Sequence, residues 1–240
     1  MGNTKLTFER YEKKYLLSRE KVEALRRELD AYLVPDEYFQ STVCSIYYDT
    51  DDFRLIRHSL DAPVYKEKLR LRSYNVPKED GLVFLELKKK YKGVVYKRRV
   101  PLRAAEAEDY LSGRSHPEKD GQVLREMDWF LKMNPVKPRA FIACDRSAYV
   151  AKDDRELRIT FDENMRWRES DLTITHGSEG KPLVEPGQVL MEIKFPEAAP
   201  LWLAELLSRM TVFPTSFSKY GTGYKNYLIQ DYLNGVNCCV

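Results

Sequence analysis

Cations recur at every second position in several strand-like segments of this 240-residue chain. Side chains alternate between the two faces of a strand, so YKEKLRLRSY places Lys68, Arg70 and Arg72 on one face. Leu69 and Leu71 fall on the other face. Arginine forks and lysine ammonium groups are suited to phosphate oxygens. The pattern predicts a strand face that binds phosphate.

The cationic face continues onto the next two strands. Lys92-Gly93 is a two-residue turn signal, and such a turn sets the register of the strands on either side. The positions brought onto one face are Glu86, Lys88 and Lys90 on the first strand and Arg99, Lys97 and Val95 on the second.

Three further strand-like segments, FERYEKKYLL, LRITFD and VLMEIKF, place charges on one face in the same way. Taken singly, each face can be a solvated outer surface with cross-strand ion pairs. If all of them line a barrel, thirteen cations meet inside against only Glu12, Glu86, Asp162 and Glu192. The thirteen are Arg10, Lys14, Lys68, Arg70, Arg72, Lys88, Lys90, Lys97, Arg99, Arg146, Arg158, Lys194 and Lys219.

Such an interior must be wet and must hold a polyanion, because each unpaired cation in a dry core costs several kcal/mol. The strands interpose mainly aliphatic residues between the cations, which favours a chain of phosphates over nucleic acid. Carboxylates among the cations suggest ligands for Mg²⁺ or Mn²⁺. Phosphoryl transfer needs mainly positioning and charge neutralisation, so the small number of histidines, three, is no obstacle.

The elements that must position these residues are mostly strands. Strands are predicted over 8–17, 43–48, 65–74, 82–90, 94–102, 140–150, 157–161, 171–175 and 189–195. Helices are predicted over 18–34, 104–112, 122–133, 201–210 and 225–233. Many strands without regular βαβ alternation predict an α+β fold, a closed antiparallel β-barrel with flanking helices, as a single domain over 1–240.

Composition excludes several classes of protein. The net charge of +3 argues against a general nucleic-acid coat, and no apolar run approaches the length that spans a bilayer. Cys44 and Cys144 are expected as buried thiols, and the adjacent Cys238 and Cys239 spell no zinc pair. The segment MGNTKLTFER lacks the pattern of a signal peptide, so the expected location is the cytoplasm.

The order of RYEKKYLL, SIYYDT, KLRLRSY, FLELKKK, DRSAY, LRITFD, MEIKF and SFSKYG resembles the VTC domain. This domain is the polyphosphate polymerase branch of the CYTH or triphosphate tunnel metalloenzyme superfamily. The resemblance covers nearly the whole chain. It implies a β-tunnel open at both ends, with charged side chains in the lumen, in which the ATP γ-phosphate is transferred to a growing polyphosphate chain.

The resemblance also implies roles for individual residues. Lys219, Arg70, Arg72 and Lys88 are the expected catalytic residues, with Lys219 acting close to the transferred phosphate. Glu192 is the expected main ligand of Mn²⁺ or Mg²⁺, helped by Glu12 and Glu86. The expected phosphate and nucleotide contacts are Arg10, Lys14, Lys68, Arg70, Arg72, Lys88, Lys90, Lys97, Arg99, Arg146, Arg158, Lys194, Ser218, Lys219 and Tyr220.

One departure from the superfamily pattern affects the expected activity. Tunnel hydrolases begin with E-x-E-x-K, whereas this chain has Arg10 at the first acidic position. Loss of that carboxylate weakens a metal site that would activate water, which favours polymerisation over hydrolysis. An inorganic or nucleoside triphosphatase remains the alternative enzyme, and a non-catalytic module that binds polyphosphate or inositol phosphate is the alternative outside enzymes. The expected partners are ATP, polyphosphate and a membrane protein, and nucleic acid is not expected to bind. The membrane protein would hold the chain at the inner face of a membrane.

Overall fold

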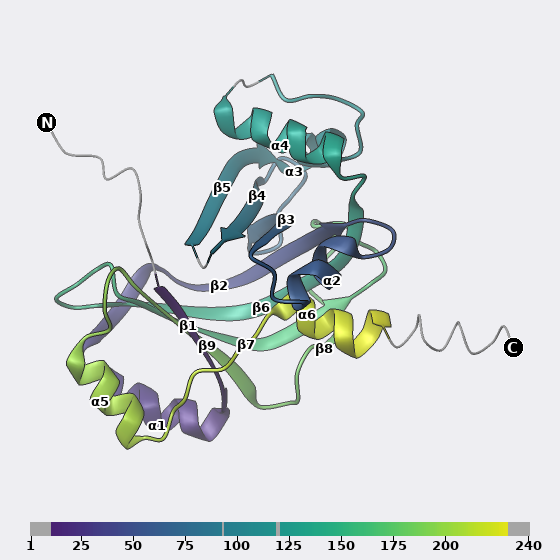
Figure 1. Cartoon of the computed structure of the whole chain (residues 1–240). Coiled ribbons are helices and arrows are strands. Elements are labelled where there is room, and N and C mark those ends of the chain that lie inside the picture. The colour runs from purple at the N-terminus through teal and green to yellow at the C-terminus, as the bar shows by residue number, and fades with distance from the viewer. Residues whose placement is uncertain (1–10, 93, 119–120, 230–240) are drawn as a thin grey trace, which may run out of the picture. The chain divides into compact units, whose positions relative to one another are not determined.

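The computed structural model describes residues 11–92, 94–118 and 121–229 (Figure 1). The chain divides into two compact units, and each unit is assembled from three separate stretches of sequence. Unit 1 takes residues from 1–41, 145–164 and 184–217, and unit 2 takes residues from 42–144, 165–183 and 218–240. The single domain expected over 1–240 stays a prediction.

Strands predominate among the described elements. The strands are β1 (Tyr11–Ser18), β2 (Leu33–Asp49), β3 (Tyr65–Tyr74), β4 (Leu82–Tyr91), β5 (Val94–Arg103), β6 (Lys137–Ala151), β7 (Arg158–Arg168), β8 (Lys181–Pro182) and β9 (Gln188–Phe195). The helices are α1 (Arg19–Leu29), α2 (Arg54–Leu60), α3 (Ala104–Leu111), α4 (Gln122–Met133), α5 (Leu201–Arg209) and α6 (Lys219–Gly223), and a π-helical turn (Tyr224–Leu228) follows α6.

The strands form one sheet in the order β1-β9-β7-β6-β2-β3-β4-β5, with β8 paired to β7. The registers of β1 with β9, β2 with β3, β3 with β4 and β4 with β5 are antiparallel. The predicted α+β class and antiparallel sheet are therefore confirmed. In the described residues the order leaves β1 and β5 as its two ends, so closure into a barrel is not shown.

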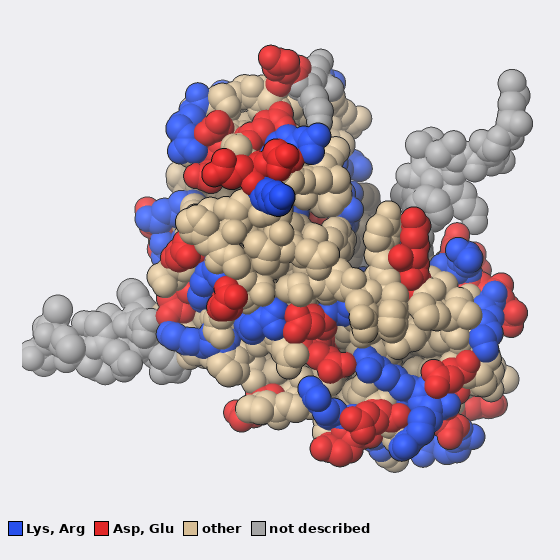
Figure 2. Space-filling model, turned by 180° about the vertical axis from the view of Figure 1, so that it is seen from behind, with Lys and Arg blue, Asp and Glu red and all other residues tan. Residues whose placement is uncertain are grey.

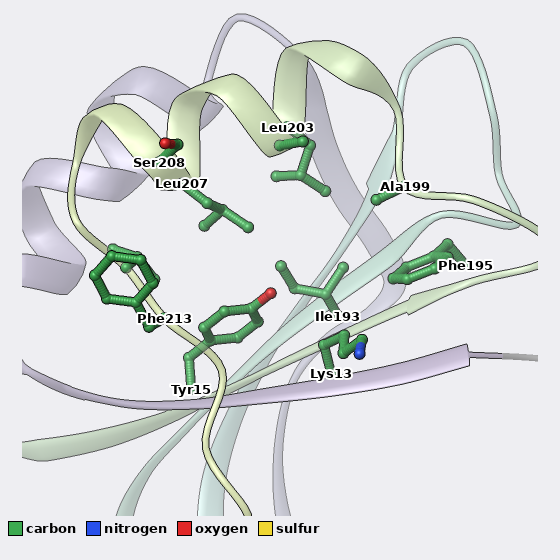
Figure 3. A pocket seen from close by; sticks show the side chains of 11 residues that line it. Lys13, Tyr15, Ile193, Phe195, Ala199, Leu203, Leu207, Ser208 and Phe213 are labelled. Atoms are coloured by element: carbon green, nitrogen blue, oxygen red, sulfur yellow. The ribbon is translucent and has the colours of Figure 1, made fainter. Parts of the chain in front are cut away.

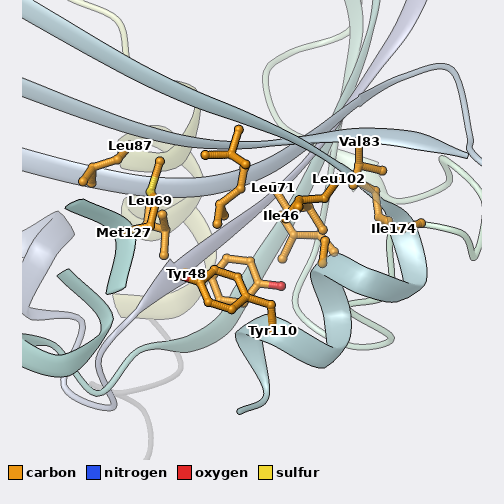
Figure 4. Close-up of a cluster of buried hydrophobic side chains, with 14 of the residues drawn as sticks. Ile46, Tyr48, Leu69, Leu71, Val83, Leu87, Leu102, Tyr110, Met127 and Ile174 are labelled. Atoms are coloured by element: carbon orange, nitrogen blue, oxygen red, sulfur yellow. The ribbon is translucent and has the colours of Figure 1, made fainter. Parts of the chain in front are cut away.

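The apolar core of unit 2 lies on one face of β3, β4 and β5. Leu69 is paired with Leu87 and Leu71 with Leu85, and all four side chains are buried. Figure 1 shows α3 and α4 lying over these strands, and Figure 4 shows Met127 of α4 within the same cluster. With its leucines buried under the helices, the alternating sequence of β3 must turn its cations to the other face.

The core of unit 1 lies between the β1 and β9 strands and the helices α1 and α5. Ser18 caps α1, its hydroxyl accepting a hydrogen bond from the Lys21 amide at 3.3 Å. The predicted helix over 18–34 is too long, because α1 ends at Leu29 and β2 begins at Leu33. Residues 30–32 form a turn between the two elements, and Pro35 accounts only for the extended backbone at Val34.

Further sequence predictions differ from the structure in the described residues, and β2 begins at Leu33, well before the strand predicted over 43–48. The strand expected over 171–175 is a loop, while β7 continues to Arg168. The Arg168 guanidinium donates to the carbonyls of Asp171 and Thr173 at 2.9 and 3.1 Å, which satisfies backbone groups that a strand would otherwise pair. The helices α2 and α6 were not predicted. The helix expected over 225–233 begins with the π-helical turn, and its residues after 229 lie outside the described part.

Two other expectations can be compared with the described residues. Cys44 and Cys144 are buried, as predicted, and form no disulfide in the described residues, whereas Cys238 and Cys239 lie outside that part of the chain. A search of the described helices finds none with the length and apolar character needed to cross a bilayer.

Candidate phosphate-binding site

The face of β3, β4 and β5 opposite the core of unit 2 carries rows of charged side chains. In one row, Arg70 is paired with Glu86, and Glu86 is paired with Arg99. The next row joins Lys68, Lys88 and Lys97 in the same way. The predicted register across the Lys92-Gly93 turn is therefore confirmed by the pairing of Tyr91 with Val94. We call the charged face the β3–β5 cluster; it comprises Lys68, Arg70, Arg72, Glu86, Lys88, Lys97 and Arg99.

Glu86 lies at the centre of the β3–β5 cluster and is only 1% exposed. Arg70 Nε donates to Glu86 Oε2 at 2.8 Å, and Arg99 Nε donates to Oε1 at 2.7 Å. Lys97 Nζ is 2.8 Å from Oε1, and Arg72 Nε is 4.0 Å from Oε2. One carboxylate is thus shared by four cations, and the local charge stays strongly positive.

Side chains beside the cluster orient its arginines. The Arg70 guanidinium donates to the Tyr47 hydroxyl at 3.3 Å, and Arg72 Nε donates to Ser45 Oγ at the same distance. Arg99 donates to the Tyr74 hydroxyl at 3.1 Å. Phenol and hydroxyl acceptors hold the guanidinium groups without neutralising them.

The protonation of the cluster follows from burial and charge. Burial raises the pKa of Glu86, but Arg70 and Arg72 outweigh that effect and hold this pKa well below its usual range. Burial lowers the pKa of Lys97 to about 8 against the attraction of Glu86. Burial also raises the pKa of Tyr74, but the hydrogen bond and charge of Arg99, with Arg72, lower it to about 8.

The segment that begins α6 belongs to the same unit and carries Ser218 and Lys219. Ser218 caps α6, its hydroxyl accepting from the Gly221 amide at 3.2 Å. Lys68 Nζ donates to the same hydroxyl at 3.1 Å, so a cation of the cluster contacts the start of the helix. Lys219 lies close enough to Tyr47 for its charge to lower the pKa of that phenol, although burial of Tyr47 is the largest single effect and opposes it.

A hydrogen bond between Tyr220 of α6 and Asp49 of β2 holds α6 in place. Tyr220 is 2% exposed, its ring stacks on Tyr47 with centroids 4.7 Å apart, and its hydroxyl donates to Asp49 Oδ2 at 3.0 Å. Asp49 is fully buried and also accepts from the amides of Leu55 and Ile56 at 2.9 and 3.0 Å. One carboxylate therefore joins the start of α2 to α6. Tyr220, expected as a phosphate contact, has its hydroxyl engaged by Asp49.

Gly223 permits a close approach of α6 to the interior of unit 2. A Cβ atom at this position would lie 2.1 Å from the ring of Trp167, which is fully buried. Any side chain larger than hydrogen would displace either the ring or the helix. The position of Lys219 thus depends on contacts at both ends of a five-residue helix.

Unit 1 carries a second charged group, formed by side chains of β1, β9, β7 and β6. Lys14 Nζ lies 3.3 Å from Glu12 Oε1 and 3.6 Å from Glu192 Oε1, and it donates to the Phe217 carbonyl at 3.2 Å. Lys194 Nζ is 3.5 Å from Glu192 Oε2. We call this group the β1–β9 cluster; it comprises Glu12, Lys14, Arg146, Arg158, Asp162, Glu192 and Lys194.

The remaining members of the β1–β9 cluster form ion pairs of their own. Arg146 makes a bidentate pair with the fully buried Asp162, with hydrogen bonds of 2.6 and 2.7 Å. It also lies 4.0 Å from Glu192. Arg158 pairs with Asp36 at the start of β2. Asp36 carried no sequence signal, because it belongs to none of the alternating segments.

The β1–β9 cluster is the place where a divalent cation fits best. Glu12 and Glu192 share the face and the neighbour Lys14, and Thr160, the cross-strand partner of Glu192, has a buried hydroxyl without a hydrogen bond in the described residues. Within the described part of the chain, no group of three or more His, Cys, Asp or Glu side chains could hold a metal unaided. Mg²⁺ commonly uses one or two carboxylates and completes its shell with water and phosphate oxygens, which agrees with this donor set.

The predicted site residues thus fall into two groups, one within each unit. Lys90 shares the face of the β3–β5 cluster, and Arg10 lies outside the described residues. Strand parity could also have identified Tyr47 and Ser45, since they are paired with Arg70 and Arg72. Asp49 had no such signal, because it accepts hydrogen bonds from backbone amides of α2 and from the distant Tyr220 and not from a cross-strand cation.

The family model of the VTC domain matches residues 9–228. Among curated proteins, the chain is similar to vacuolar transporter chaperone complex subunit 4 of Trypanosoma brucei brucei, with 24% identity over 76% of this chain. The match covers 28% of that relative, so the chain spans less than a third of its length.

Solved structures show a similar fold. A putative adenylate cyclase from Bacillus halodurans aligns with a TM-score of 0.55 and 18% identity, over 88% of this chain and 95% of the other. A putative adenylyl cyclase from Hippeastrum, described as having a dominant triphosphatase activity, aligns with a TM-score of 0.53 and 14% identity, over 90% of this chain and 95% of the other.

Proposed function

Because the chain belongs to the VTC domain family, we propose that it is an ATP-dependent polyphosphate polymerase. The terminal phosphate oxygen of a polyphosphate chain attacks the γ-phosphorus of ATP, the bond to the β-phosphate oxygen breaks, and ADP leaves. The β3–β5 cluster is the observation that carries this proposal. Its six cations include four that share the single buried carboxylate of Glu86, and the set is suited to a run of phosphates.

The residues of unit 2 act by positioning and by neutralising charge. Arg70 and Arg72 are held at fixed orientations by Tyr47 and Ser45, so they are ready to bind phosphate oxygens without rearrangement. Lys88 adds a point charge in the next row. Lys219, at the start of α6, is the proposed contact to the transferred phosphate, where negative charge must be stabilised.

Mn²⁺ or Mg²⁺ is the proposed cofactor, with Glu192 and Glu12 as its protein ligands. A metal held there would neutralise charge on the phosphate oxygens. Lys14 contacts both carboxylates, and its ammonium group offsets their negative charge when phosphate is absent. For Glu86, the third carboxylate predicted as a ligand, we propose instead the role of a counter-charge for the cations around it.

The family resemblance also implies a closed tunnel, and closure is part of the proposal. A protein partner belongs to the proposal as well, because the curated relative is a subunit of a complex. We propose a membrane protein for that partner and the cytoplasmic side of the membrane for the chain.

The activity is tested by incubating the purified chain with ATP and Mn²⁺ and resolving the products on a gel. Ladders of polyphosphate are expected, with one ADP released for each phosphate that is added to a chain. Release of orthophosphate alone would replace the polymerase by the triphosphatase. Tight polyphosphate binding without turnover in any divalent metal would replace it by the non-catalytic module.

Neighbouring residues on opposite faces of β4 and β5 provide matched variants. Lys88→Gln and Arg99→Gln remove cations of the β3–β5 cluster and should reduce turnover and phosphate affinity. Lys89→Gln and Arg98→Gln remove cations that pair with Glu126 on the other face, and they should leave both unchanged. Equal loss in the two pairs would contradict the assignment of the phosphate-binding face.

Glu192→Gln tests the proposed metal ligand. It should abolish metal-dependent turnover and leave tripolyphosphate binding intact or stronger, because one negative charge leaves a cationic surface. Equal loss of binding and turnover would mean that Glu192 serves the fold and not the metal.

A further inference from the structure

A cavity of about 280 Å³ lies in unit 1, between β1, β9 and α5 (Figure 3). It occupies the face of β1 and β9 opposite Lys14 and Glu192, because its wall is formed by the alternate residues Lys13, Tyr15 and Ile193. Leu203 and Leu207 of α5 close the other side. The walls are aliphatic and aromatic, unlike the charged face of the same strands.

Two polar groups interrupt the apolar wall. Tyr15 is 6% exposed, its hydroxyl points into the cavity in Figure 3, and it has no hydrogen-bond partner among the described residues. A hydroxyl that faces the pocket can donate a hydrogen bond to an occupant that carries an acceptor. The Lys13 ammonium stands on an exposed part of the lining and makes no ion pair within the described part of the chain.

These observations define the chemistry of an occupant. An engineered apolar cavity of about 150 Å³ accommodates benzene, so a cavity nearly twice as large takes a body of roughly eight to ten carbons. A carboxylate can bind both polar groups, since it accepts a hydrogen bond from a phenol and forms an ion pair with an ammonium. We propose that this cavity binds a medium-chain carboxylate, with its tail against Leu203 and Phe195 and its head at Tyr15 and Lys13.

The inference does not depend on the polymerase activity, because the residues of the cavity belong to neither charged cluster. Calorimetry with octanoate, below the concentration at which it forms micelles, tests it directly. One site with a Kd on the order of 1 mM is expected for a ligand of this size. Octylamine has a similar tail and the opposite charge, and it should bind about tenfold more weakly or not at all.

Three variants locate the binding. Tyr15→Phe should weaken octanoate binding about tenfold through the lost hydrogen bond, and Lys13→Gln about threefold to fivefold through the lost charge. Ala204→Phe fills the cavity and should abolish binding. Arg27→Gln, an exposed cation of α1 outside the lining, is the matched control and should change nothing.

Some results would overturn the proposal. Absence of saturable octanoate binding would do so, as would equal binding of octylamine. Binding that survives both Tyr15→Phe and Lys13→Gln would place the ligand elsewhere, and this test holds even if Ala204→Phe fails to fold. Circular dichroism of each variant confirms that the folded chain is being measured.

Discussion

Glu86 illustrates how one buried residue balances a functional surface. Its carboxylate is shared by Arg70, Arg99 and Lys97, all within 2.8 Å. Removing one partner from a buried ionic group leaves the others uncompensated, and the loss is large compared with a surface ion pair. The stability of unit 2 is therefore coupled to the occupancy of its phosphate-binding face.

Glu86→Gln should lower the free energy of unfolding by about 2–4 kcal/mol without anions, because the surrounding cations then repel one another. Tripolyphosphate should recover much of this loss by binding the folded state. Urea unfolding with and without tripolyphosphate measures both effects. Glu67→Gln, on the opposite face of β3, is the control and should cost less than about 1 kcal/mol. A Glu86→Gln loss that tripolyphosphate does not reduce would contradict the coupling.

The pH dependence of phosphate binding follows from Lys97 and Tyr74. Each has a pKa of about 8, so between pH 7 and 9 the lysine loses its positive charge and the phenol gains a negative one. Both changes oppose anion binding, and tripolyphosphate affinity should fall about fivefold for each group, a value reduced for their solvent exposure. Calorimetry across this range measures it.

Lys97→Arg separates the two titrating groups. A guanidinium stays charged across this range, so the variant should keep only the part of the pH dependence that Tyr74 contributes. Tyr74→Phe should remove the other part. A pH profile unchanged in both variants would assign the dependence to other groups.

At the residue scale, strand parity predicted which side chains share the β3–β5 cluster. The prediction succeeded because alternation fixes the face and a two-residue turn fixes the register. It also assigned Glu86 correctly to the face of Arg70 and Arg99. Strand parity could not predict which side chains form contacts within that face, where four cations surround the Glu86 carboxylate.

Elements with a clear apolar period were predicted well, and elements fixed by individual hydrogen bonds from side chains were not. The helix α4 was predicted with its observed bounds, since its apolar spacing is sufficient to define it. The short helices α2 and α6 were missed because they are held by Asp49, a residue on the preceding strand β2. The loop expected as a strand over 171–175 was missed because Arg168 binds its carbonyls.

Asp49→Asn tests the link between α2 and α6. The amide has only one acceptor oxygen, so the variant should lose about 1–3 kcal/mol of stability and increase hydrogen exchange in residues 219–228. Misplacement of Lys219 should reduce product formation more than it reduces ATP binding. Both effects are measured on the same protein, by mass spectrometry and by product gels.

Tyr220→Phe refines that test because it removes one hydrogen bond and keeps the ring stack on Tyr47. It should raise exchange in α6 without affecting α2. Tyr227→Phe is the matched control, since its hydroxyl donates instead to the Pro182 carbonyl. Similar effects in both variants would mean that Asp49 does not position α6 specifically.

At the scale of the whole molecule, net charge conceals how charge is distributed. The chain carries only +3, yet each unit gathers cations on one strand face. On the side of the molecule seen in Figure 2, basic and acidic side chains are interspersed over the surface. On this side of the molecule, nucleic acid would find charges of both signs and no surface of one sign to follow.

Salt should therefore affect binding more than folding. Raising the salt from about 0.1 M to 1 M shortens the screening length from about 10 Å to 3 Å and should weaken tripolyphosphate binding at least about tenfold. The melting temperature should change by only a few degrees, because the carboxylates of Asp162 and Glu86 are buried and screened less than surface charges. A parallel fall in both quantities would indicate that the charged faces hold the fold together instead.

The two faces of β1 differ in chemistry, and this difference limits which mutations the strand tolerates. Lys14 faces Glu192, while Tyr15, the next residue, lines an apolar cavity. Deletion of a single codon in this strand before Lys14 would move every following side chain to the wrong face, with the Lys14 ammonium at the cavity and the Tyr15 phenol on the charged face. Point substitutions spare that alternation. Natural variants of this strand should therefore differ in residue identity and almost never in length.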